Sequence, residues 1–155
     1  MAVPRKNSGP QLDEVDLRLI AELDADARLS LAELARRVGL SPQSVSERLK
    51  RLEDLGVVTG YAVELDPARL GLALGAYIRI SPALGELSRV AQLVKEMPEI
   101  VECDRVTGED CFIAKVFVAS VTDLERVIDR LLPHARTNTS VIQSSPVKRR
   151  RPRIG

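Results

Sequence analysis

The sequence predicts an α+β chain with an N-terminal helix-turn-helix (winged-helix-like) domain followed by a ferredoxin-like domain of order βαββαβ. Three observations predict this fold. The chain has 155 residues, of which 45% are hydrophobic, and this suits one or two small domains. Residues 12–60 contain three short stretches in which apolar residues recur at helical spacing. After residue 60 the apolar residues mostly alternate, as in strands, and two further helical stretches interrupt them.

Five segments follow from these changes of pattern. Their composition identifies a flexible arm, a helix-turn-helix domain, a linker strand or hinge, the ferredoxin-like domain and a mobile basic tail. Within the linker, Tyr61, Val63 and Leu65 alternate with other residues and predict a strand. In order, the segments are 1–11, 12–60, 61–71, 72–147 and 148–155.

Capping residues mark the first three helices. The first helix should begin at Asp13. Ser30 and Glu33 form a capping-box pattern for a helix from Leu31 to Val38, and Gly39 can end it in the left-handed conformation. Ser41 at the N-cap and Pro42 at the first position then predict a third helix that continues to Leu55.

The second domain should contain four strands and two helices. Thr122 and Glu125 form a capping-box pattern for its second helix, and Pro98 ends the first. The expected strands are 72–81, 100–106, 110–118 and 137–145, and the expected helices are 85–97 and 122–132.

Several classes of protein are excluded by composition. No apolar run approaches the roughly 18–20 residues that cross a bilayer, and no signal sequence opens the chain, so we expect a cytoplasmic protein. Two cysteines and one histidine are too few for a disulfide scaffold or a zinc site, and we predict no metal and no cofactor. Cys103 and Cys111 fall near each other across a hairpin, which leaves a redox link open, but inert buried thiols are favoured. His134 should be a solvated residue at a helix end.

The outer face of the third helix carries the clearest functional signal. Val45, Leu49 and Leu52 fall on one side, and polar residues occupy the other. Arginine and lysine neutralise phosphates, and glutamine and serine can reach base edges, so we predict binding to double-stranded DNA. The alternative is an ordinary solvated helix face. Glu47 is unfavourable near phosphate but can accept from a cytosine amino group. The candidate DNA-binding residues are Ser41, Gln43, Ser44, Ser46, Arg48, Lys50 and Arg51.

Two stretches resemble the Lrp/AsnC (feast/famine) family of transcription regulators. They are "LDEVDLRLIAELDADARLSLAELARRVGLSPQSVSERLKRLEDLGVVTGYAVELDPARLG" and "VTGEDCFIAKV". The resemblance implies DNA binding through the third helix and a ferredoxin-like domain that forms dimers and often octamers. It also implies an amino acid or related small-molecule effector bound between dimers.

The same resemblance indicates the effector loop. Asp110 stands where an aromatic residue is usual in the family, and Cys111 stands where an acid is usual, so the effector can differ from an ordinary amino acid. The candidate effector-binding residues are Gly108, Glu109 and Asp110 in the loop, with Thr137, Thr139 and Ser140 on the final strand. No catalytic residues are predicted. The alternative functions on this fold are a sirohaem-decarboxylase-like enzyme, which a single histidine disfavours, and a metabolite sensor that does not bind DNA.

Overall fold

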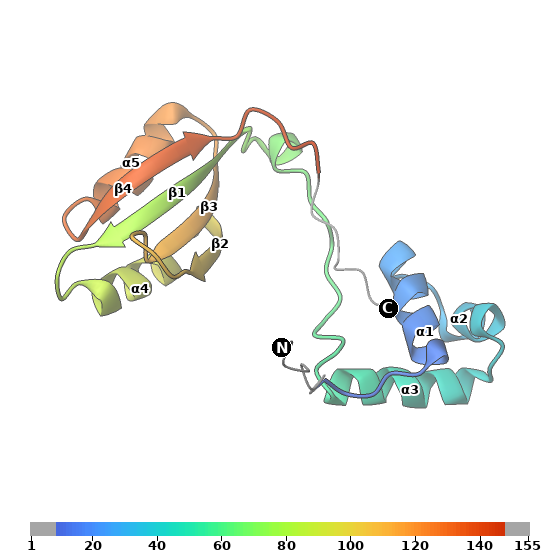
Figure 1. Ribbon diagram of the computed structural model, residues 1–155. Coiled ribbons are helices and arrows are strands. Elements are labelled where there is room, and N and C mark those ends of the chain that lie inside the picture. The colour runs from blue at the N-terminus through green and yellow to red at the C-terminus, as the bar shows by residue number, and fades with distance from the viewer. Residues whose placement is uncertain (1–8, 148–155) are drawn as a thin grey trace. The chain divides into compact units, whose positions relative to one another are not determined.

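The structure is a computed structural model that describes residues 9–147, and the chain divides into two compact units between Val63 and Glu64 (Figure 1). Residues 1–8 of the expected arm and the whole expected tail, 148–155, lie outside the described residues. The first unit holds helices α1 (Glu14–Ala25), α2 (Leu31–Val38) and α3 (Pro42–Asp54). The second unit begins with a short 3-10 helix, η1 (Pro67–Leu70), and holds the sheet.

Local capping positions the three helices of the first unit. Asp13 caps α1, because its carboxylate accepts from the Asp16 backbone N–H and the Asp16 carboxylate accepts from that of Asp13. Ser30 Oγ accepts from the Glu33 backbone N–H at 3.2 Å, which confirms half of the predicted box. The reciprocal bond is replaced, since the Glu33 carboxylate binds arginines of α2 instead. Gly39 has φ 74° and ends α2 as predicted.

The core of the first unit forms where the three helices meet. Each helix contributes apolar residues from one face, at the spacing that the sequence pattern predicts. This packing fixes α3 against α1 and α2, so the face of α3 that points away from them is held in a defined orientation. The buried residues of this cluster are Leu19, Leu23, Leu34, Ala35, Val38 and Val45.

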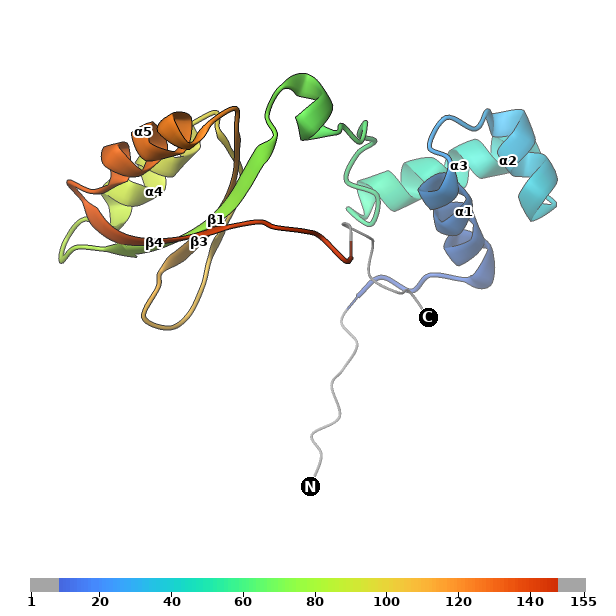
Figure 2. The same ribbon diagram turned by 90° about the horizontal axis from the view of Figure 1, so that it is seen from above.

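The second unit confirms the ferredoxin-like prediction. Its four strands form an antiparallel sheet of order β2-β3-β1-β4, and Figure 2 shows α4 and α5 on the same side of it. Apolar side chains from β1, β3 and both helices build one core between the sheet and the helices. The elements are β1 (Leu74–Pro82), α4 (Leu87–Glu96), β2 (Ile100–Arg105), β3 (Phe112–Val118), α5 (Val121–Leu131) and β4 (Ala135–Val141).

The opposite face of the sheet is not covered by α4 or α5 (Figure 2). Tyr77 and Lys115 are paired across β1 and β3, and their side chains stand on this face with that of Phe117. The Lys115 ammonium lies 5.7 Å from the centroid of the Tyr77 ring and 5.4 Å from that of Phe117. Tyr77 is 44% exposed, so the uncovered face presents aromatic surface.

The strand predicted around Tyr61, Val63 and Leu65 is wrong for the single chain. Residues 61–66 belong to no helix or strand, and Val63 and Leu65 are 82% and 68% exposed. A strand exists only through hydrogen bonds to a neighbour, and alternation alone does not provide one.

The predicted capping box of the last helix is also wrong. Ser120, not Thr122, caps α5: its Oγ accepts from the Asp123 backbone N–H at 3.2 Å and donates to the Asp123 carboxylate at 2.6 Å. The helix therefore begins at Val121, one residue before the predicted start. The ends of the strands differ more from their predicted positions. The final strand, expected over 137–145, is Ala135–Val141.

The cysteine and histidine predictions are partly corrected. Cys103 lies opposite Ala114 rather than beside Cys111, because β3 starts only at Phe112 and Cys111 belongs to the loop before it. Both cysteines are free, and burial raises the pKa of Cys103, which favours the unreactive thiol. His134 is paired rather than simply solvated, since its Nδ1 lies 2.8 Å from a carboxylate oxygen of Glu86.

Candidate functional site

The start of α3 has the predicted geometry. Ser41 is the N-cap, and its Oγ accepts from the Ser44 backbone N–H at 3.1 Å. The hydroxyls of Ser41 and Ser44 also bond each other at 2.9 Å. Pro42 occupies the first helical position, where the missing N–H costs nothing. The N-terminal end of α3 is therefore fixed by its own residues.

The outer face of α3 carries exposed polar side chains, among them those of Gln43, Ser46, Glu47 and Lys50. Gln43 Nε2 donates to Glu47 Oε1 at 3.1 Å, one helical turn along. Val45 and Leu52 on the opposite side are fully buried. The structure thus brings the predicted outer residues together on one exposed surface.

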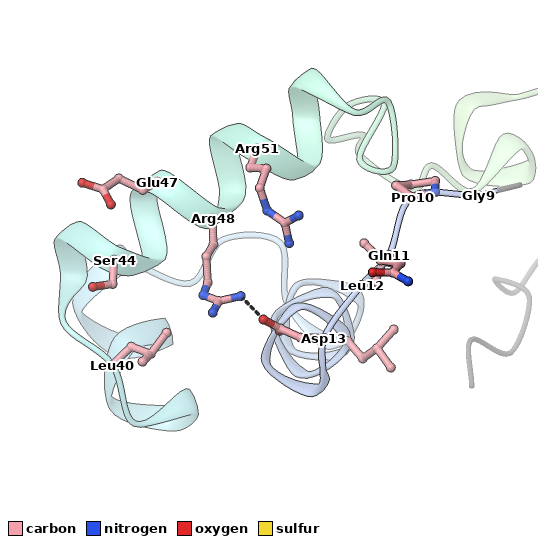
Figure 3. Close-up of a pocket in the computed structure, with 11 residues that line it drawn as sticks. Gly9, Pro10, Gln11, Leu12, Asp13, Leu40, Ser44, Glu47, Arg48 and Arg51 are labelled. Carbon is pink, nitrogen blue, oxygen red and sulfur yellow. Dashed lines mark hydrogen bonds and ion pairs between the residues drawn. The ribbon is translucent and has the colours of Figure 1, made fainter.

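Arg48 and Arg51 point elsewhere, toward the N-terminal end of α1. Arg48 Nη1 donates to the Asp13 carboxylate at 2.6 Å and to that of Asp16 at 2.8 Å, and Figure 3 shows Arg48 directed at Asp13. Arg51 donates to the other carboxylate oxygen of Asp16. The side chain of Asp16 is fully buried, whereas Arg48 and Arg51 are 30% and 45% exposed. These four residues, called here the α1–α3 clamp, join the two helices.

The charges of the clamp stabilise one another. The backbone N–H of Asp16 and the Arg48 guanidinium lower the pKa of Asp13. Burial alone would raise the pKa of Asp16, but hydrogen bonds from the Asp13 backbone, Arg48 and Arg51 outweigh it and lower the pKa. The pKa of Arg48 is raised by its bonds to Asp13 and Asp16. The clamp is consequently charged at neutral pH, and Asp13 and Asp16 were missed in sequence reasoning because their partners are more than 30 residues away.

A hollow of about 1120 Å³ lies beside the clamp. Pro10 and Leu12, in the segment that precedes α1, border one side of it, and Ser44 and Glu47 of α3 border the other (Figure 3). Both arginines that line it are already paired with carboxylates. The hollow therefore offers an anionic ligand no unpaired guanidinium.

The basic residues of α2 form a second ion-pair group. Glu33 binds Arg36 at 2.6 Å and Arg37 at 2.8 Å, and Arg37 also binds Glu22 of α1 at 2.7 Å. The bonds from Arg36 and then Arg37 lower the pKa of Glu33 to about 2. Arg36 is 73% exposed and remains open to solvent on its outer side.

The predicted effector loop lies between β2 and β3. Gly108 has φ 122°, a conformation that favours glycine. Asp110 accepts from Ser81 Oγ at 2.8 Å, and its other oxygen lies 3.8 Å from Arg79 Nε. Arg79 also donates to Asn138 at 3.2 Å. Sequence reasoning missed Arg79, Ser81 and Asn138, although alternation along β1 places positions 79 and 81 on one face.

The structure separates the three predicted residues of the final strand. Thr139 pairs with Ile78 and Thr137 with Ile80, and both isoleucines are fully buried on the face that α4 and α5 cover. Ser140 pairs with Tyr77 and therefore stands on the uncovered face, as do Arg79 and Asn138. Ser140 therefore shares a face with Arg79 and Asn138, the residues linked to Asp110, and Thr137 and Thr139 do not.

Residues 9–147 contain neither a metal-binding cluster nor a membrane-spanning helix. Within that range no group of three or more His, Cys, Asp or Glu side chains is arranged to hold a metal ion. None of the helices described there is long and apolar enough to cross a membrane.

Two family models match the chain on either side of the division between the units. The model of a winged helix-turn-helix DNA-binding domain matches residues 12–59. The model of the Lrp/AsnC ligand binding domain matches residues 75–152. The first contains α1 to α3, and the second contains the sheet with α4 and α5.

Individual relatives agree with both models. The chain is 36% identical over 134 residues to the HTH-type transcriptional regulator LrpC of Bacillus subtilis, which covers 86% of this chain and 93% of LrpC. The solved structure of LrpC superposes with a TM-score of 0.86 at 34% identity, covering 90% of this chain and all of that one.

Two other relatives have names or structures that include an amino acid. The leucine-responsive regulatory protein of Escherichia coli is 33% identical over 135 residues, 85% of this chain and 82% of that protein. A feast or famine regulatory protein of M. tuberculosis, solved with L-methionine, has a TM-score of 0.85 at 34% identity and covers 91% of this chain and 98% of that one. With both domains matched in order, the chain belongs to the Lrp/AsnC family of transcriptional regulators.

Proposed function

We propose that the chain regulates transcription by placing α3 in the major groove of double-stranded DNA. The observation that carries this proposal is the exposed polar face of α3, on a helix that capping and packing hold in place. Ser41, Gln43, Ser44 and Ser46 lie toward the N-terminal end of the helix, the end that reads base edges in helix-turn-helix proteins. Lys50 lies one turn further and is suited to a phosphate.

Arg48 and Arg51 have a different role in this proposal. Their bonds to Asp13 and Asp16 suit them to hold α3 at a fixed angle to α1. Each guanidinium has five N–H donors and is partly exposed, so a remaining N–H can also contact a phosphate. In this proposal they contribute to affinity and to the position of α3, and the outer residues contribute to sequence preference.

We propose that the effector is an amino acid or a related small zwitterion, bound beside Gly108, Glu109 and Asp110. The Asp110 carboxylate suits an ammonium group, and Arg79, only loosely paired with it at 3.8 Å, suits a carboxylate. A zwitterion can replace this weak ion pair with two shorter ones. The names and ligands of the relatives support an amino acid, and Ser140 stands on the same face.

We further propose that the chain acts as a homodimer or a larger assembly in the cytoplasm. Two exposed apolar surfaces support self-association. The first is the linker, where Tyr61, Val63 and Leu65 alternate without pairing to a strand among the described residues. The second is the uncovered face of the sheet with Tyr77 and Phe117. A two-fold dimer would favour a roughly palindromic operator.

Gel shifts with genomic fragments, including the chain's own promoter, test the regulator proposal. We expect a shift, and we expect Gln43→Ala combined with Arg51→Ala to weaken it.

The proposals on assembly and effector have their own tests. Sedimentation velocity should give a species larger than 17.0 kDa. An amino acid effector should raise the melting temperature, because a ligand at a hundredfold excess over its Kd stabilises by about 2.7 kcal/mol, and Asp110→Ala should abolish the rise. A protein that shifts no fragment, or that converts a tetrapyrrole, would contradict the proposal.

A further inference from the structure

We infer that Glu47, oriented by Gln43, is a specificity-determining residue that accepts a hydrogen bond from the 4-amino group of a cytosine in the major groove. The inference rests on the proposed function and deepens it, since it assigns a base chemistry to one position of α3. It follows from the partners of Glu47, from the partners of the neighbouring arginines and from the chemistry of base edges.

Glu47 has no cationic partner among the described residues. Arg51 stands four residues along the helix, at the spacing at which an arginine commonly pairs with a glutamate. In this chain Asp16 binds Arg51, so the α1–α3 clamp withdraws this guanidinium from Glu47, and no ion pair joins Glu47 to Lys50, three residues along, in the described part of the chain. Glu47 consequently brings a negative charge to the face proposed to approach phosphates, and this charge weakens binding to any DNA sequence.

The bond to Gln43 orients the carboxylate without neutralising it. Gln43 Nε2 donates to Glu47 Oε1 at 3.1 Å, and the described residues give Glu47 Oε2 no partner. An ionised carboxylate only accepts hydrogen bonds. One of the two N–H groups of Gln43 Nε2 is used in this bond, and the other N–H and the carbonyl oxygen of Gln43 stay available. The free Oε2 of Glu47 therefore presents an acceptor to the groove and requires a donor on the base edge.

Only two groups donate in the major groove, the cytosine 4-amino group and the adenine 6-amino group. The adenine amino group stands beside N7, an acceptor that repels a carboxylate. On the cytosine base itself, the neighbour of the amino group is a carbon-bound hydrogen. Cytosine is thus the base that a single carboxylate accepts best, and guanine and thymine present only acceptors or a methyl group.

The test begins with operators that the full-length wild-type chain selects from a random DNA library. We expect a fixed cytosine in each half-site. Replacing that cytosine by thymine, or by pyrimidin-2-one, which lacks the 4-amino group, should weaken binding about 5- to 150-fold. Glu47→Gln should reduce both losses to less than about threefold and should strengthen binding to random DNA, because a repulsive charge is removed.

Asp54→Asn is the matched control. Asp54 is an exposed acid at the last residue of the same helix, so the variant removes the same charge about 10 Å along the axis. It should retain the full preference for cytosine. A wild-type operator without a fixed cytosine, or a Glu47→Gln variant that discriminates as strongly as the wild type, would overturn the assignment while the proposed function stands. A wild-type chain that binds no DNA would overturn both.

Discussion

Replacing Asp16 by asparagine should destabilise the first unit far more than its small change in shape suggests. The buried carboxylate accepts three hydrogen bonds, from the Asp13 backbone at 3.1 Å, from Arg48 at 2.8 Å and from Arg51. Asparagine keeps one acceptor oxygen and turns an NH₂ group toward donors. At least one charge-assisted bond to an arginine is then lost, and an N–H is left without its acceptor.

The magnitude follows from those losses. A hydrogen bond to a charged group contributes about 1.5–3 kcal/mol, and breaking a buried ion pair costs about 3–5 kcal/mol. Arg48 retains Asp13, and both guanidiniums are partly exposed, so we expect the lower part of this range, about 2–3 kcal/mol. For a small domain this lowers the melting temperature by about 10–20 °C.

Amide hydrogen exchange on the full chain measures this loss separately for each unit. The opening free energy of amides in α1, α2 and α3 should fall by about 2–3 kcal/mol in Asp16→Asn, and the sheet amides should not change. Glu14→Gln, an exposed neighbour in the first turn of the same helix, is the control and should cost less than about 1 kcal/mol. Equal protection in the two variants would refute the reasoning that the clamp stabilises the unit.

Three further predictions concern stability. Because the pKa values of Asp13 and Asp16 are lowered from 3.8, their ionised forms stabilise the fold above about pH 4, and this contribution should be lost as pH falls through the lowered values. The urea midpoint of the wild type should therefore fall below about pH 4, and the midpoint of Asp16→Asn should fall by a smaller amount over the same pH range. Gly39→Ala should cost about 1 kcal/mol in a urea titration, because alanine resists φ 74°. Ser120→Ala should cost about 1 kcal/mol by the same measurement, whereas Thr122→Ala should change stability by less than about 0.5 kcal/mol; the opposite order would restore Thr122 as part of the cap.

The sequence predicts best those features whose causes are local. The bounds of α2 are correct because Ser30 and Gly39, which begin and end it, adjoin it in the chain. The start of α3 is correct for the same reason, since Ser41 and Pro42 act on the first turn that follows them. Apart from the strand predicted in the linker, the order of helices and strands is correct because the change from helical to alternating spacing is itself a local pattern.

Features that depend on a distant partner were not predicted. The helical wheel places Arg48 at the border of the apolar face, but only the fold reveals that the Asp16 carboxylate, 32 residues earlier, binds it. The alternation of Tyr61, Val63 and Leu65 is real, but a strand also needs a neighbour that this chain does not provide within its described residues.

The effector residues combine both cases. Alternation already places Thr139 and Ser140 on opposite faces of a strand, so their separation was accessible from the sequence. The contact of Asp110 with Ser81 was not accessible from the sequence, because it depends on how the loop between β2 and β3 folds back toward β1.

The most direct test of the central proposal, that the outer face of α3 binds DNA, is the affinity of a triple variant for an operator selected by the wild type. Gln43→Ala, Ser46→Ala and Lys50→Ala together remove this face, and all three side chains are exposed, so the fold should be preserved. Fluorescence anisotropy should show at least about a tenfold loss on the operator and a smaller loss on random DNA, because base contacts carry about 1–3 kcal/mol each. A correctly folded triple variant that binds the operator as tightly as the wild type would contradict the proposal.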